Sequence, residues 1–144
     1  MKKTTLTLLL FVMLAGCRQS SSVAEVSIEQ IMGDTSVVNV MYFRVQKRCA
    51  ACNAVGDVAQ RTVETIFGDN NNVRYFEIDN TVRANRPLIE KYEVYWNALI
   101  IAKGETFVDI TQRAFLNALS NPQLVENLIK QEINTLLSKS QINP

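Results

Sequence analysis

Residues 48–52 read Arg48-Cys49-Ala50-Ala51-Cys52, a C-x-x-C pair that follows an apolar run and precedes a helical pattern. The run from Val37 to Phe43 is β-branched and aromatic, which is typical of a strand. Between Ala50 and Phe67, apolar residues recur at helical spacing. The pattern therefore predicts a strand, then the cysteine pair, then a helix whose first turn contains both thiols.

This placement predicts redox chemistry at the pair. Unpaired N–H groups and the positive dipole end of the helix would stabilise a Cys49 thiolate, and Lys47 and Arg48 add positive charge nearby, so we expect a lowered pKa for the Cys49 thiol. Cys52 lies three residues on, shielded by the first turn but close enough to attack a mixed disulfide at Cys49. We therefore expect Cys49 to be the nucleophile and Cys52 the resolving cysteine, joined as a redox disulfide, with Lys47 and Arg48 tuning the thiol pKa.

The N-terminus predicts export and lipidation. Two lysines precede an apolar stretch, Leu6 to Leu14, that is too short to span a bilayer as a mature helix. The stretch ends in Leu14-Ala15-Gly16-Cys17, which resembles the lipobox of bacterial lipoproteins, in which the cysteine is acylated and becomes the first mature residue. We therefore expect a signal peptide over residues 1–16, a lipid on Cys17, a tether and lead-in segment over 17–33, and a domain over 34–144. The protein would then lie in the bacterial cell envelope, lipid-anchored and facing the periplasm.

The composition fits one small exported domain. Its 15 basic and 14 acidic side chains nearly cancel, which gives no electrostatic case for binding nucleic acid. Acylation of Cys17 would leave one cysteine pair in a compartment where disulfides persist. We expect a single-domain monomer with one hydrophobic core and with no cofactor besides its redox disulfide.

The rest of the chain alternates strand and helix patterns. Periodicity, turn residues and capping residues mark the boundaries. In chain order the expected elements are a strand over 73–78 with Val73 and Tyr75 on one face, a helix over 83–92 broken at Pro87, and a buried strand over 99–102. A turn at 103–105 and a hairpin strand over 106–110 follow. An amphipathic helix then starts at Asn121-Pro122 and buries a stripe from Leu124 to Leu137.

This order resembles the thioredoxin fold over roughly residues 36–139. Members of that family carry a C-x-x-C at the start of a helix, a central sheet, a β-hairpin and a C-terminal helix packed across the sheet. The resemblance implies an α/β, thioredoxin-like fold, in which a central mixed β-sheet is flanked by α-helices. It also matches Cys49 to the family's nucleophile and Cys52 to its resolving cysteine.

Two departures from the family affect the site. Thioredoxins place a cis-proline before the third strand, facing the C-x-x-C, whereas Tyr95, Trp96 and Asn97 fill this region here. We expect a trans peptide there, because a non-proline cis bond costs about 3 kcal/mol, and a substrate groove lined by these three residues. The family's buried acid also has no match, because residues 41–43 of the strand are Met, Tyr and Phe. Asp57 and Glu77 are then the nearest candidates for acid–base help.

Two functions remain open at this point. The first is a membrane-anchored thiol–disulfide oxidoreductase that acts on protein thiols and disulfides; as a reductant it would need an electron-donor protein in the membrane. The alternative is a non-enzymatic module whose cysteine pair holds a soft ion such as Cu(I), or which binds a membrane-protein partner. A zinc site is disfavoured because two thiolates do not complete a tetrahedral shell and the chain has no histidine.

Overall fold

A four-stranded mixed sheet forms the centre of the molecule. The computed structural model describes residues 28–46 and 49–139, and its strands have the order β2-β1-β3-β4. Strand β1 (Val38–Arg44) pairs in parallel with β2 (Val73–Asp79), whereas β3 (Ala98–Lys103) runs antiparallel to both β1 and β4 (Thr106–Asp109).

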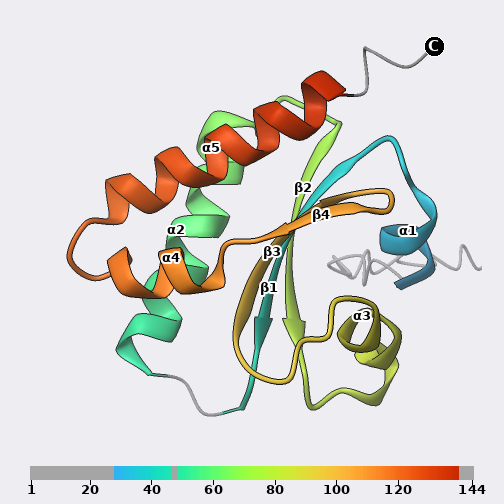
Figure 1. The fold of residues 1–144 in the computed structure, drawn as a ribbon, viewed down its shortest axis with the longest axis horizontal. Coiled ribbons are helices and arrows are strands. Elements are labelled where there is room, and N and C mark those ends of the chain that lie inside the picture. Colours follow the sequence, from blue (N-terminus) through green and yellow to red (C-terminus); the bar gives the residue numbers. More distant parts are fainter. Residues whose placement is uncertain (1–27, 47–48, 140–144) are drawn as a thin grey trace, which may run out of the picture.

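Helices cover both faces of this sheet (Figure 1). On one side lie α2, α4 and α5; on the other lie α1 and α3, the latter preceded by a short 3-10 turn, η1. Their bounds are α1 Ile28–Gly33, α2 Ala50–Ile66, η1 Arg83–Asn85, α3 Arg86–Lys91, α4 Thr111–Asn117 and α5 Pro122–Lys139. The expected fold class, α/β with a mixed sheet between helices, is confirmed.

Strand β1 separates two hydrophobic clusters. Its side chains alternate between the faces, so Val38, Val40 and Tyr42 join the cluster beneath α2 and α5. Met41 and Phe43 join the cluster on the side of α1 and α3. This alternation is what points Tyr42 toward the helix that carries the cysteine pair.

Local signals in the sequence place most element boundaries correctly. The predicted break at Pro87 appears as the change from η1 to α3, with Pro87 in the first turn of α3. Gly104 adopts φ +57° in the turn between β3 and β4, a conformation that glycine accepts without strain. Asn121 caps α5, because its Oδ1 accepts a hydrogen bond of 3.2 Å from the Leu124 N–H.

Two details differ from expectation. Helix α4 is absent from the predicted elements because its seven residues carry no apolar stripe: Ala114 is its buried residue, and Leu116 is exposed. Leu124, expected in the buried stripe of the last helix, is instead exposed, because it lies in the first turn of α5, off the face that packs on the sheet.

The segment before β1 also contributes to the hydrophobic cluster on the side of α1 and α3. Ile31 of α1 is buried there, so the folded part of the chain includes residues within the predicted lead-in segment. The predicted signal peptide, Cys17 and the start of the tether lie outside the described residues. No helix within residues 28–46 and 49–139 combines the length and the apolar character needed to cross a membrane.

Candidate redox site

Cys49 and Cys52 form a disulfide at the N-terminus of α2, with their Cα atoms 4.9 Å apart. Cys49 is the N-cap residue, and its extended backbone (φ −105°, ψ 167°) directs the side chain back over the first turn. The backbone N–H of Cys52 donates to Cys49 Sγ at 3.1 Å. The expected placement at a helix N-terminus is confirmed, and one of the unpaired N–H groups of the helix already faces the sulfur.

The two cysteines differ sharply in exposure. Cys49 is exposed, whereas Cys52 is only 5% exposed and lies behind it. A partner sulfur arriving from solvent therefore meets Cys49 first. Lys47 and Arg48, predicted to tune the thiol pKa, lie outside the described residues, so this role stays a prediction.

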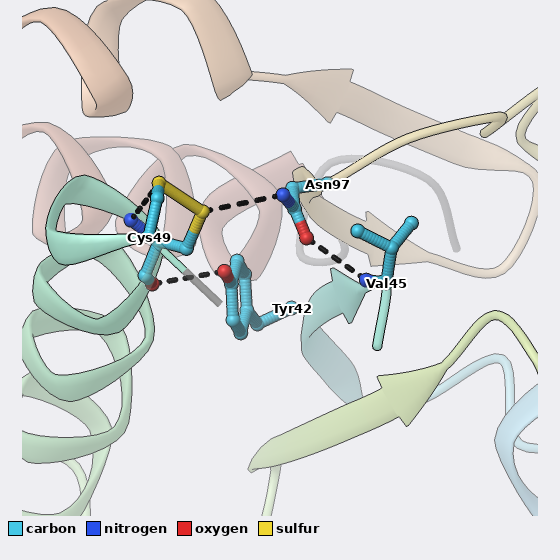
Figure 2. The surroundings of a disulfide bond; sticks show 5 residues. Tyr42, Val45, Cys49 and Asn97 are labelled. Carbon is cyan, nitrogen blue, oxygen red and sulfur yellow. Dashed lines mark hydrogen bonds between the residues drawn. A yellow bond between two sulfur atoms is a disulfide. The ribbon is translucent and has the colours of Figure 1, made fainter. Parts of the chain in front are cut away.

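Tyr42 lies directly beneath the cysteine pair. Its hydroxyl donates to the backbone carbonyl of Cys52 at 2.8 Å, and its side chain is almost fully buried (Figure 2). One turn along α2, a Cβ on Gly56 would lie only 3.0 Å from Tyr42 Cε1, so the absence of a side chain there lets the helix approach the ring. Together these contacts fix the first turn of α2 against the central strand.

A second tyrosine contacts α2 one turn further along, and more weakly. Tyr75 donates to the carbonyl of Gly56 at 3.5 Å. Burial, reinforced by the charge of Glu77, raises the pKa of Tyr75 above its ordinary value, so its hydroxyl stays a neutral donor. Sequence reasoning missed the role of both tyrosines, because an aromatic residue in a strand is as typical of packing as of a hydrogen bond.

Asn97 connects the disulfide to the end of β1. Its Nδ2 donates to Cys52 Sγ at 3.4 Å, and its Oδ1 accepts from the Val45 N–H at 2.9 Å (Figure 2). Asn97 immediately precedes β3, within the segment where the sequence predicts a trans peptide. The described residues contain no cis peptide bond, so the expected trans peptide at this place is confirmed.

Tyr95 and Trp96 lie on the same loop and point into solvent, with 78% and 76% of their surfaces exposed. The loop is nevertheless held at several points. Asn80 Nδ2 donates to the Trp96 carbonyl at 2.9 Å, and Val94 is buried in the cluster beside α3. The structure thus places Asn97 against the disulfide and the two aromatic residues beside it on a fixed loop. A substrate groove formed by all three stays a prediction.

A narrow polar cleft opens beside the buried cysteine, with room for about one water molecule. Both carboxylates suggested for acid–base help line it. Its full lining is Tyr42, Arg44, Cys52, Asn53, Gly56, Asp57, Glu77 and Asn97. Arg44, the last residue of β1, forms ion pairs with Glu77 and, at 2.9 Å, with Asp79. Glu77 is therefore held by a cation, while proton transfer by Asp57 or Glu77 stays a prediction.

The residues present offer limited means to hold a metal ion. In the part of the chain that the structure describes, no three or more His, Cys, Asp or Glu side chains gather in a way that could bind one. A two-coordinate site for a soft ion between the reduced sulfurs of Cys49 and Cys52 would need no third ligand, and it stays a prediction.

Comparison with known proteins gives a distant likeness among solved structures. No family model matches the chain, and no curated protein matches it. Among solved structures, the chain is similar to the crystal structure of thioredoxin from Trypanosoma brucei brucei, at 19% sequence identity and a TM-score of 0.45. The likeness covers 76% of this chain and 88% of that chain. The α/β fold class itself rests on the sheet order and on the helices that cover both faces.

Proposed function

We propose that this protein is a lipid-anchored thiol–disulfide oxidoreductase of the bacterial cell envelope, which exchanges its Cys49–Cys52 disulfide with protein thiols and disulfides. The observation that carries the proposal is the unequal exposure of the two sulfurs at a helix N-terminus. An attacking thiolate must reach the substrate, so Cys49 is exposed and faces a backbone N–H. A resolving thiol must be hidden from solvent but within reach of the first sulfur, as Cys52 is.

The reaction runs in two exchanges. In the first, the Cys49 thiolate attacks a substrate disulfide, so that the substrate S–S bond breaks, a Cys49–substrate disulfide forms and one substrate thiolate leaves. In the second, the Cys52 thiolate attacks Cys49 Sγ, which forms the Cys49–Cys52 disulfide and releases the second substrate thiolate. Two electrons pass from the cysteine pair to the substrate, and the reverse sequence donates a disulfide instead.

The first test is the equilibrium reduction potential of the pair. The full chain carrying Cys17→Ser, in mild detergent, has two titrating thiols and can be equilibrated in glutathione buffers and followed by alkylation. A potential between roughly −270 and −120 mV is the expected result for a working oxidoreductase. A value well below about −300 mV would mark an inert structural bridge and would overturn the proposal.

Turnover and anchoring are tested separately. Cys49→Ser should abolish reduction of a model protein disulfide, whereas Cys52→Ser should trap Cys49 as a mixed disulfide. In cells given a labelled fatty acid, the parent should incorporate the label and Cys17→Ser should not. If the parent incorporates no label, the lipid anchor is refuted while the redox proposal still stands.

A further inference from the structure

The side-chain amide of Asn97 lies between Cys52 Sγ and the end of β1 (Figure 2). We propose that Asn97 stabilises the Cys52 thiolate through its Nδ2–H, and so makes the cysteine pair a stronger oxidant and prepares Cys52 for the resolving step. This inference rests on the proposed function, because it concerns the second exchange at the same site.

The orientation of the amide follows from its second contact. The Val45 N–H is a donor, so it requires the oxygen of the Asn97 amide, and the distance of 2.9 Å is that of a good hydrogen bond. With the oxygen committed to Val45, the NH₂ group must face Cys52 Sγ. A strand end therefore determines which atom of Asn97 faces the sulfur.

The same donor acts differently on the two redox states. A disulfide sulfur is a weak acceptor, whereas a thiolate forms a charge-assisted hydrogen bond of about twice the strength of a neutral one. Cys52 is only 5% exposed and the cleft beside it has room for about one water molecule, so the solvation that bulk water would give a thiolate is largely missing there. The contact therefore favours the reduced pair, which raises the reduction potential.

The two sulfurs then have donors from different parts of the fold. Cys49 Sγ accepts from the backbone N–H of Cys52, within α2, whereas Cys52 Sγ accepts from the loop before β3. The helix N-terminus is the usual means of stabilising the first thiolate. Asn97 extends the same kind of stabilisation to the second thiolate, whose hydrogen-bond donor comes from outside α2.

In the resolving step, Asn97 transfers no proton. The Cys52 thiol gives its proton to solvent, its thiolate attacks Cys49 Sγ, and the departing substrate thiolate takes up a proton from solvent. Asn97 raises the fraction of Cys52 that is ionised before the attack, at a smaller cost in the nucleophilicity of each thiolate. Its removal should therefore prolong the life of the mixed disulfide.

The test compares Asn97→Asp with the parent in the full chain carrying Cys17→Ser. The aspartate keeps an oxygen for the Val45 N–H but presents a second oxygen, instead of a donor, to the sulfur. We expect the equilibrium with glutathione to shift about tenfold toward the disulfide, which corresponds to a potential ~30 mV more negative for a two-electron couple. Asn97→Ala, which removes both contacts, should shift it in the same direction.

The matched control is Asn80→Ala. Asn80 holds the same loop through the Trp96 carbonyl but has no contact with sulfur. The equilibrium constant of this variant with glutathione should therefore lie within about twofold of that of the parent. Mixed-disulfide lifetime, measured after quenching with acid, should lengthen in Asn97→Asp and stay unchanged in Asn80→Ala.

Three results would overturn the inference: an unchanged potential in Asn97→Asp, a more positive one, or an equal shift in Asn80→Ala, which would mean that loop position rather than the donor matters. Failure of the proposed function is distinct, because it would appear in the parent as an inert potential. Even then, the difference between the parent and Asn97→Asp can be measured in dithiothreitol buffers, so the role of the donor is still decided.

Discussion

The two ends of strand β1 are built from different interactions. At its start, Val38 and Val40 pack among apolar side chains beneath α5, and Val40 pairs with Ile101 of β3. At its finish, the strand meets a polar group made by Arg44, Asn97 and the cysteine pair. Burial of apolar surface holds the first end, whereas directed hydrogen bonds from distant segments arrange the second. Stability and redox function should therefore respond to different substitutions.

The largest expected effect on stability comes from the apolar end. Ile101→Ala removes a fully buried side chain and should lower the free energy of unfolding by about 2–5 kcal/mol, because the cavity cannot collapse in a packed core. Urea unfolding measures the loss. Below the transition, the reduction potential of the pair should equal that of the parent; a shift as large as that expected for Asn97→Asp would refute the separation of the two ends.

A smaller effect is expected where α2 meets Tyr42. Gly56→Ala adds a methyl group 3.0 Å from the Tyr42 ring, and overpacking of this kind costs roughly 1–3 kcal/mol. Unlike the core variant, it should also change the potential, because the ring supports the first turn of α2. Gly33→Ala serves as the control, since a Cβ there meets nothing within 4 Å. Equal unfolding midpoints for the two variants would contradict the close approach at Gly56.

Tyr42→Phe isolates the hydrogen bond from the packing. The ring stays in place, but the 2.8 Å contact with the Cys52 carbonyl is lost, which should cost about 1 kcal/mol. Denaturant unfolding of the oxidised and the reduced protein measures this cost in each redox state. Tyr75→Phe, which loses only a 3.5 Å contact, should cost less; the reverse ranking would show that Tyr42 is held by packing alone.

The smallest effect on stability is expected at the exposed loop. Trp96→Ala should change the free energy of unfolding by less than about 0.5 kcal/mol, because the side chain is largely in solvent. If Trp96 lines the substrate groove, the KM for a protein disulfide should rise severalfold while turnover of a small disulfide stays constant. Equal losses for both substrates would exclude the predicted docking role of this residue.

The contrast between the two ends of β1 also explains which features could be predicted from the sequence. Alternation in strand β2 predicted that Val73 and Tyr75 share one face, and both contribute to the cluster beneath α2 and α5, because the hydrophobic period follows directly from backbone geometry. Helix α4 escaped this reasoning because it is short and buries little. Cys49 could be placed at a helix N-terminus from local pattern alone.

The contacts around Cys52 could not be predicted in the same way. Asn97 lies 45 positions from Cys52 in the sequence, and Tyr42 lies ten positions before it. A hydrogen bond between distant segments leaves no period in the sequence, and a polar residue before a strand is as common in an ordinary turn. Position before β3 suggested that Asn97 is near the site, but the direction of its amide required the Val45 contact.

The two ion pairs of Arg44 also constrain how the parallel strands align. Arg44 lies opposite Asp79 in the pairing of β1 with β2, and its guanidinium also pairs with Glu77, two positions earlier on β2. If β2 slipped by one residue, Glu77 and Asp79 would turn to the opposite face, and the guanidinium would meet Ile78 instead. The two ion pairs of Arg44 thus favour the observed alignment of β1 with β2. The same alignment sets the shape of the cleft beside Cys52, which Arg44 and Glu77 both line.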